Sequence, residues 1–114
     1  MKIPDVEDLL VDREKIAQYL LAATHPDGST KAEFFSRFGF TVPQWRELAD
    51  ALRKHGASGK VIRVVESSYG TRYAVDGPLE TPDRRNPLIR TVWLLRQSGT
   101  TARLITAYPI GGQR

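Results

Sequence analysis

The stretch RTVWLLRQSGTTARLITAYP, residues Arg90 to Pro109, decides the fold that the sequence predicts. Branched and aromatic side chains fill both halves of it, and the Ser-Gly-Thr in its middle is typical of a turn. The pattern predicts a β-hairpin with strands over Leu88–Gln97 and Ala102–Ile110. Because successive side chains of a strand point to opposite faces, regular alternation places four polar or aromatic residues on one face. They are Thr91, Trp93, Thr106 and Tyr108.

A second pair of strands precedes this hairpin. Alternating apolar residues predict strands over Val61–Glu66 and Thr71–Val75, with a turn at Tyr69-Gly70. The connection Asp76–Pro87 contains three prolines and leads into the hairpin. The second half of the chain therefore predicts a four-stranded antiparallel sheet.

Helical spacing of apolar residues dominates the first half. Helices are expected over Arg13–Ala23, over Lys31–Phe38, and from Thr41 to a stop at His55-Gly56. The predicted fold is α+β, with about three N-terminal helices packed on one face of the four-stranded antiparallel sheet. The other face is expected to be open.

At 114 residues, the chain is expected to be a single domain, 1–114. Residues 1–12 are predicted to be an extended arm, 13–56 the helical part and 60–110 the antiparallel sheet.

The amino-acid composition favours some classes of function and excludes others. Seventeen Lys and Arg against thirteen Asp and Glu give a net charge of +4, which favours an anionic partner, nucleic acid first, with an ordinary soluble surface as the alternative. The absence of cysteine and the presence of only two histidines predict no metal site and no cofactor. No stretch approaches the roughly 20 apolar residues of a membrane span. The N-terminal sequence MKIPDVE is too acidic for a secretion signal. The protein is therefore expected to be cytoplasmic with no membrane partner.

Short motifs in a fixed order carry a resemblance to a known family. They are His25-Pro26, Lys31-Ala32, Phe34-Phe35, Phe38-Gly39-Phe40, Tyr69-Gly70-Thr71-Arg72-Tyr73, Gly77-Pro78-Leu79, Arg90-Thr91-Val92-Trp93 and Thr106-Ala107-Tyr108-Pro109. This order resembles a small family of toxin-like domains found in bacterial polymorphic toxins and toxin–antitoxin loci. That family is similar to the ribonuclease toxins of the barnase, EndoU, colicin and RelE fold group. The resemblance implies metal-independent cleavage of RNA. One departure is Arg84-Arg85-Asn86, where an Asp-Gly turn is expected.

Cleavage of RNA without a metal requires a base for the 2′-hydroxyl proton, donors for the charge on the phosphorane, and an acid for the 5′-oxygen. The motif positions that fit these tasks are the predicted catalytic residues: His25, Lys31, Arg90, Thr106 and Tyr108. The predicted substrate-binding residues are Arg72, Arg84, Arg85, Thr91 and Trp93. Because these groups act on one phosphate, His25 and Lys31 are expected to lie close to Arg90.

Each of these residues also has a structural interpretation. His25 is equally a turn residue, and Trp93 more often anchors a core than stacks on a base. Arg90 is equally a residue that pairs with a carboxylate such as Glu80 or Asp83. His55 is expected to end a helix.

Three functions therefore stay open. The first is a metal-independent endoribonuclease toxin with a small antitoxin or immunity protein as its partner. The second is a non-catalytic RNA- or ribosome-binding module. The third is a domain whose basic surface binds only a protein partner.

Overall fold

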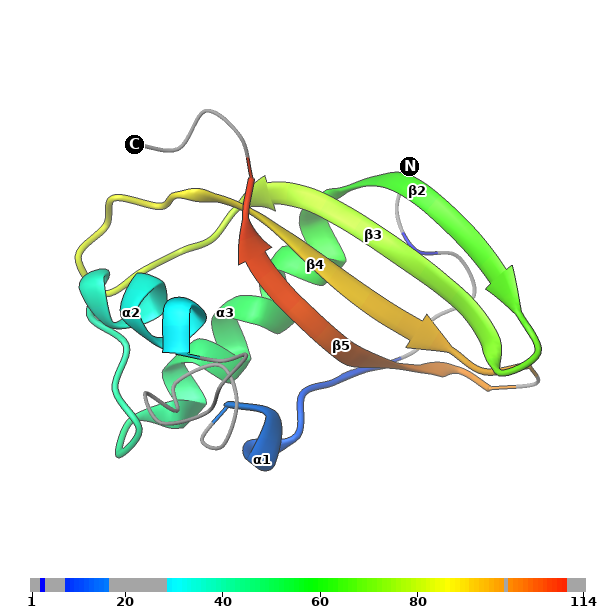
Figure 1. The fold of residues 1–114 in the computed structure, drawn as a ribbon, viewed down its shortest axis with the longest axis horizontal. Coiled ribbons are helices and arrows are strands. Elements are labelled where there is room, and N and C mark those ends of the chain that lie inside the picture. The colour runs from blue at the N-terminus through cyan, green and yellow to red at the C-terminus, as the bar shows by residue number, and fades with distance from the viewer. Residues whose placement is uncertain (1–2, 4–7, 17–28, 98, 111–114) are drawn as a thin grey trace.

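A five-stranded sheet forms the body of the molecule (Figure 1). The structure is a computed structural model that describes residues 3, 8–16, 29–97 and 99–110. The strands lie in the order β1-β5-β4-β3-β2. Their bounds are β1 Asp8–Leu10, β2 Lys60–Ser67, β3 Gly70–Pro78, β4 Leu88–Leu95 and β5 Thr101–Pro109. Neighbouring strands are antiparallel except for β1, which runs parallel to β5.

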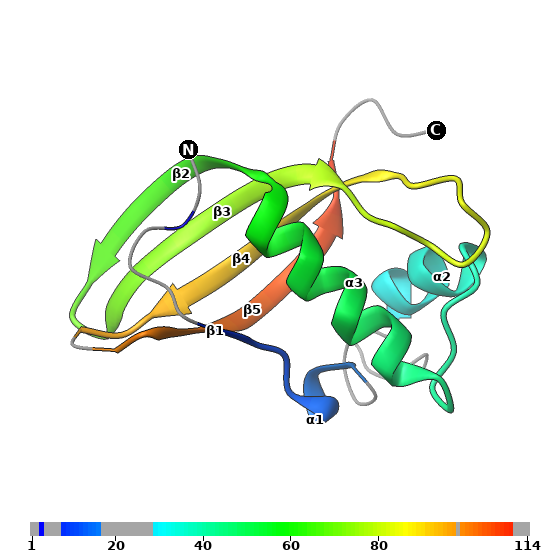
Figure 2. The ribbon, with the colours of Figure 1, turned by 180° about the vertical axis from the view of Figure 1, so that it is seen from behind.

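Three helices lie among the described residues. They are α1 Arg13–Lys15, α2 Ser29–Arg37 and α3 Trp45–Ser58. Figure 2 shows α3 crossing one face of the sheet diagonally, while α2 lies beyond the end of the sheet, beside the connection between β3 and β4. None of the helices that the structure describes has an apolar stretch long enough to cross a membrane.

The predicted architecture of three N-terminal helices on a four-stranded antiparallel sheet is wrong. The sheet has a fifth strand and is mixed, and α3 is the one long helix. The extra strand comes from the predicted arm, where Leu9 pairs with Ala102 along the outer edge of β5. An edge strand offers unpaired backbone groups to any neighbouring segment, and a strand of three residues is too short to leave a periodic signal in the sequence. Of the helix predicted over Arg13–Ala23, the structure describes only residues 13–16, and these are helical.

α3 is amphipathic and buries one side against the sheet. Its buried residues are Leu48, Ala49, Leu52, His55 and Gly56. At Gly56 the helix backbone approaches the ring of Trp93 so closely that a Cβ there would lie 2.6 Å from Trp93 Cζ2. The helix and the central strand β4 are therefore in direct contact at this point.

The core lies between α3 and the covered face of the sheet. Its sheet side is formed by Tyr73, Val75, Ile89, Trp93, Leu95, Ala102, Leu104 and Ala107. Trp93 is fully buried, in agreement with the interpretation of this residue as a core anchor. Burial of a large apolar side chain contributes roughly 1.5–3 kcal/mol, so this cluster is the main source of stability.

A β-bulge in β5 changes which residues share a face. Val92 pairs with Thr106, but Trp93 pairs with Leu104, so Ile105 is an extra residue between the two pairs. The predicted common face of Thr91, Trp93, Thr106 and Tyr108 is therefore wrong. Thr91 and Trp93 point to the helix, whereas Thr106 and Tyr108 point to the opposite face, because the extra residue shifts the alternation by one position.

Candidate functional site

No described helix covers the other side of the sheet, which we call the open face (Figure 1). The strand registers place its side chains in three rows of four, each row running from β2 through β3 and β4 to β5. The first row is Lys60, Asp76, Arg90 and Tyr108, the second is Arg63, Ala74, Val92 and Thr106, and the third is Val65, Arg72, Leu94 and Arg103. Five of these residues are basic and one is acidic. A surface with this charge attracts anions.

The first row contains a tight polar cluster. Arg90 Nε donates to Asp76 Oδ1 at 2.7 Å, and Arg90 Nη2 donates to Asp76 Oδ2 at 3.0 Å. This is a bidentate pair, the strongest geometry available to a guanidinium and a carboxylate. Asp76 lies on β3, and Tyr108 lies directly opposite Arg90 on β5, the other neighbour of β4. The hydrogen bonds with Asp76 first, and with Tyr108 second, raise the pKa of Arg90 above its ordinary value, so the guanidinium is always charged.

This arrangement gives Arg90 a fixed orientation without using all of its donors. A guanidinium has five N–H groups in one plane, and the pair with Asp76 engages Nε and Nη2. The side chain of Arg90 is 32% exposed, so a ligand can reach it through N–H groups that Asp76 and Tyr108 do not use. The cluster can therefore hold an anionic oxygen, with the phenol of Tyr108 as a further donor.

The predicted partner of Arg90 was a carboxylate such as Glu80 or Asp83, and the observed partner is Asp76. Glu80 pairs with Lys54, and Asp83 pairs with Arg85. Asp76 was missed because the strand was predicted to end at Val75, whereas β3 continues to Pro78. The sequence does offer one signal, since an acidic residue in a strand is stabilised by a basic residue opposite it on the neighbouring strand.

The remaining predicted site residues on the open face lie one or two rows from this cluster. Thr106 is in the second row and half-buried, and Arg72 is in the third row and exposed. Residues two positions apart along a strand are separated by about 6.6 Å, so these rows lie side by side. The structure thus brings together Arg90, Thr106, Tyr108 and, farther along, Arg72.

Thr91 and Trp93 lie on the covered face, and both are fully buried. The indole Nε1 of Trp93 donates to Thr91 Oγ1 at 2.7 Å, and the same oxygen lies 2.9 Å from His55 Nδ1. In this arrangement neither Thr91 nor Trp93 can touch a substrate. They belong to a polar network inside the core.

His55 completes that network and links α3 to the sheet. Its Nε2 lies 3.1 Å from the carbonyl oxygens of both Gly77 and Ile89. Carbonyl oxygens only accept, so Nε2 carries the proton and donates, and Nδ1 accepts from the hydroxyl of Thr91. This is the neutral form of the ring, and burial lowers the pKa of His55 below 6.5. The helix-ending histidine of the sequence is therefore a core residue with both ring nitrogens satisfied.

Arg84 and Arg85 lie away from the open face, on the connection between β3 and β4. Arg85 pairs with Asp83 at 2.6 Å, donates to the carbonyl oxygen of Arg37 at 2.8 Å and packs over the ring of Phe38. These contacts attach the connection to α2. Arg84 and Asn86 have φ values of 64° and 47°, the left-handed conformation that the expected Asp-Gly turn would also supply.

Two predicted catalytic side chains lie outside the part of the chain that the structure describes. His25 lies outside the described residues, as does the side chain of Lys31, although the backbone of Lys31 belongs to α2. The predicted proximity of these two residues to Arg90 therefore stays a prediction.

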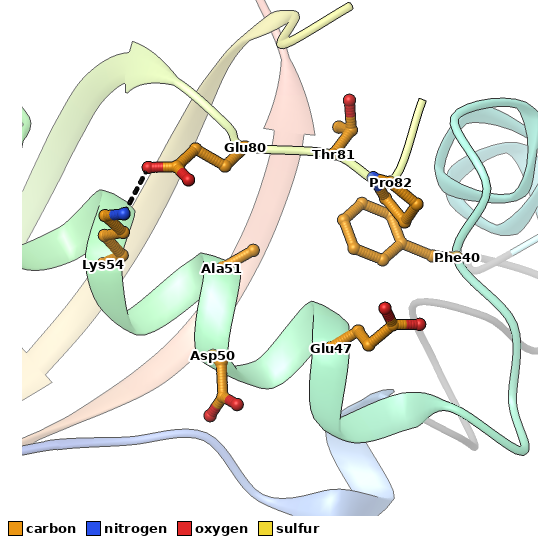
Figure 3. Close-up of a pocket in the computed structure, with 8 residues that line it drawn as sticks. All are labelled: Phe40, Glu47, Asp50, Ala51, Lys54, Glu80, Thr81 and Pro82. Carbon is orange, nitrogen blue, oxygen red and sulfur yellow. Dashed lines mark ion pairs between the residues drawn. The ribbon is translucent and has the colours of Figure 1, made fainter. Parts of the chain in front are cut away.

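A groove between α3 and the connection is an alternative location for a site (Figure 3). It has a volume of about 370 Å³, and an ion pair between Lys54 and Glu80, 2.6 Å long, crosses one end. Glu47 and Asp50 also line it. Three carboxylates and one ammonium group disfavour an anionic ligand. Within the described ranges, no group of three or more acidic or histidine side chains has the arrangement of a metal site. The open face is therefore the stronger candidate.

Comparisons with known proteins agree with this fold. Residues 2–111 match the model of the family described as Domain of unknown function (DUF6883), and the chain belongs to that family. A comparison with curated proteins finds no match. Among solved structures, the chain is similar to one chain of a contact-dependent growth inhibition toxin–immunity protein complex from Klebsiella pneumoniae 342. The TM-score is 0.71 at 18% identity, and the match covers 88% of this chain and 98% of that chain. At this identity the likeness concerns the fold.

Proposed function

We propose that this chain is a metal-independent endoribonuclease toxin that binds RNA on its open face and acts in the cytoplasm. The observation that carries the proposal is the row of Asp76, Arg90 and Tyr108 on a strongly basic face of the sheet that no described helix covers. The fold likeness to a component of a toxin–immunity complex supports the toxin role.

Cleavage of RNA requires a base, a group that binds the phosphate, and an acid. His25 acts as the base and takes the proton of the ribose 2′-hydroxyl, whose oxygen then attacks the adjacent phosphorus. Arg90 holds the non-bridging oxygens as the 2′-oxygen–phosphorus bond forms and negative charge accumulates. The bond from phosphorus to the 5′-oxygen breaks, and that oxygen receives a proton, with Tyr108 as donor. The products are a 2′,3′-cyclic phosphate and a free 5′-hydroxyl.

Asp76 and Thr106 have supporting tasks in this scheme. The bidentate pair fixes the plane of the Arg90 guanidinium before the substrate arrives, so no binding energy is spent on ordering it. Thr106, diagonal to Arg90 on the open face, donates to the backbone of the bound RNA.

RNA incubated with the purified protein in excess EDTA tests the proposal. Fragments that end in 2′,3′-cyclic phosphates support it. RNA that is shifted in a gel but intact favours the non-catalytic binding module, and RNA that is neither cut nor bound favours a domain that binds only a protein.

The fold likeness to a chain of the toxin–immunity complex also supports an immunity protein as the partner. An immunity protein with an acidic surface would cover the basic open face and block access to Arg90. Because the neighbouring complex contains both a toxin and an immunity protein, the opposite role is the second candidate. Expression of this chain alone in bacteria separates the two. A toxin arrests growth, whereas an immunity protein that accumulates to a high soluble level leaves growth normal.

A further inference from the structure

A small pocket lies at the opposite end of the open face from Arg90, beside the turn between β4 and β5. We call it the turn pocket. It has a volume of about 230 Å³, and its lining includes Leu10, Leu94, Arg96, Thr101 and Arg103. The turn itself is closed by a hydrogen bond from the Gly99 N–H to the carbonyl oxygen of Arg96, 3.0 Å long.

The turn pocket is continuous with the open face. Arg103 pairs with Leu94 on one side and with Leu10 on the other, so these three residues extend the third row of the open face onto β1. Arg72 pairs with Leu94 and completes the row on β3. A ligand that lies along the sheet from Arg90 therefore reaches the pocket without leaving the surface.

The chemistry of the turn pocket suits a phosphate and the sugar or base attached to it. Arg96 and Arg103 supply two guanidinium groups and Thr101 a hydroxyl, while the two half-buried leucines form an apolar floor. Guanidinium groups bind phosphate through paired N–H donors. The volume is below the roughly 300–1,000 Å³ of pockets that enclose a whole small molecule, so part of a longer ligand fits better than a separate metabolite.

We propose that the turn pocket is a second phosphate subsite for the same single-stranded RNA whose scissile phosphate lies at Arg90. The inference rests on the proposed function, since it assumes that RNA occupies the open face. The subsite holds the strand and takes no part in the chemistry, so it acts on affinity and on the minimum length of the substrate.

The geometry sets that length. Leu94 lies four positions from Arg90 along β4, which corresponds to about 13 Å. A stacked strand advances about 3.4 Å per nucleotide and an unstacked one farther, so the two subsites are about two to four nucleotides apart. RNA of more than about five nucleotides can occupy both subsites, and a dinucleotide can occupy only one.

One carboxylate competes for the subsite. Asp12 Oδ2 lies 3.6 Å from Arg103 Nε, and both side chains are substantially exposed. Exposed ion pairs of this kind contribute little to the free energy of folding, so a phosphate can displace Asp12 from Arg103. Arg96 makes no side-chain hydrogen bond or ion pair with any residue that the structure describes.

The test uses the double variant Arg96→Ala/Arg103→Ala and a matched control, Arg46→Ala/Arg53→Ala, on α3. Both remove two positive charges, but the control residues lie on the helix side of the molecule. Affinity is measured by fluorescence anisotropy in EDTA with a labelled twelve-nucleotide single-stranded RNA and a labelled dinucleotide. Cleavage of both is followed in parallel, and thermal unfolding checks that each variant is folded.

The double variant should bind the twelve-nucleotide RNA about tenfold more weakly, with a shallower salt dependence, and should bind and cut the dinucleotide as the wild type does. The control should bind both RNAs nearly as the wild type does. Equal losses in the two variants, or a double variant that binds the long RNA normally, overturn the subsite while leaving the cleavage proposal intact. A wild-type protein that neither binds nor cuts either RNA overturns both.

Discussion

Arg90 and Asp76 lie directly opposite each other on β4 and β3 and are joined through both oxygens of the carboxylate, at 2.7 and 3.0 Å. The pair is half-buried and lies at one end of a basic surface. Asp76 therefore does more than neutralise one charge, because it fixes the direction in which Arg90 presents its free N–H groups.

Replacement of Arg90 should remove activity and keep the fold. Arg90→Ala should lower the single-turnover rate of RNA cleavage by a factor on the order of 10²–10³, because a donor to the developing phosphorane is lost. The free energy of unfolding should change by no more than about 1 kcal/mol, since the pair is partly exposed. Arg90→Lys keeps the charge but cannot form the bidentate pair, so its rate should also fall. Arg53→Ala, a cation on α3 paired with Asp50, is the control, and an equal loss there would contradict the assignment.

RNA binding should weaken steeply with salt. Each phosphate contact with a single strand contributes about −0.7 to the slope of log affinity against log salt, so three to five contacts give roughly −2 to −4. Arg72→Ala should make the slope shallower by about one contact, and Arg46→Ala on α3 should leave it unchanged. Titrations at several salt concentrations measure both slopes. An affinity that does not respond to salt would argue against the open face as the binding surface.

Stability should fall as the pH drops through the range in which His55 titrates. The pKa of His55 is below 6.5 in the folded protein and near 6.5 in the unfolded chain, so the unfolded chain binds more protons between these values. The contribution of His55 is therefore complete above pH 6.5 and is lost as the pH falls through the folded pKa. Urea unfolding at pH values between 8 and 5 measures this trend.

Two variants isolate the origin of that pH dependence. His55→Gln should remove the decrease between pH 6.5 and 5, and should destabilise the protein at pH 8 by roughly 1–3 kcal/mol because buried polar groups lose their partner. His25→Gln replaces the other histidine of the chain and should keep the decrease. A decrease that persists in His55→Gln would assign it to other groups.

Gly56→Ala should destabilise the protein although it removes a glycine from a helix. Helix propensity alone favours Ala by about 1 kcal/mol. At this position, however, the new Cβ would lie 2.6 Å from Trp93 Cζ2 and 2.7 Å from Cε2, and overpacking of a core costs roughly 1–3 kcal/mol. Chemical unfolding should show a net loss, whereas Ala57→Gly at the exposed neighbouring position should show only the propensity cost. A more stable Gly56→Ala would mean that α3 moves away from β4 at little cost.

Much of the secondary structure follows from the sequence because its signals are local. The hairpin of β4 and β5 and the span of α3 were predicted within a few residues, since turn residues and periodicity mark them. β1 was not predicted, because a strand of three residues is defined by the partner it pairs with and not by its own pattern. The polar partners of Arg90 and His55 also come from elements far away in the sequence.

The candidate site also depends on pairing between distant residues, which local sequence patterns do not predict. Arg90, Thr106 and Tyr108 were predicted from their chemistry. They share the open face because of the bulge in β5, whereas regular alternation would separate Arg90 from the other two. Regular alternation placed Thr106 and Tyr108 beside Trp93, and one bulged residue, Ile105, places them beside Arg90 instead. Bulges depend on the twist and pairing of the whole sheet, which no local pattern records.

The bulge also determines how insertions and deletions in β5 affect related proteins. Loss of the residue at Ile105 leaves Leu104 on the helix side and Thr106 on the opposite side, because a regular strand alternates across that junction. Loss of a residue on either side of the bulge instead exchanges interior and exterior for the rest of the strand. In an alignment of relatives, a one-residue gap at Ile105 is therefore compatible with the same fold, whereas a gap two positions away is compatible with it only if the bulge is lost as well.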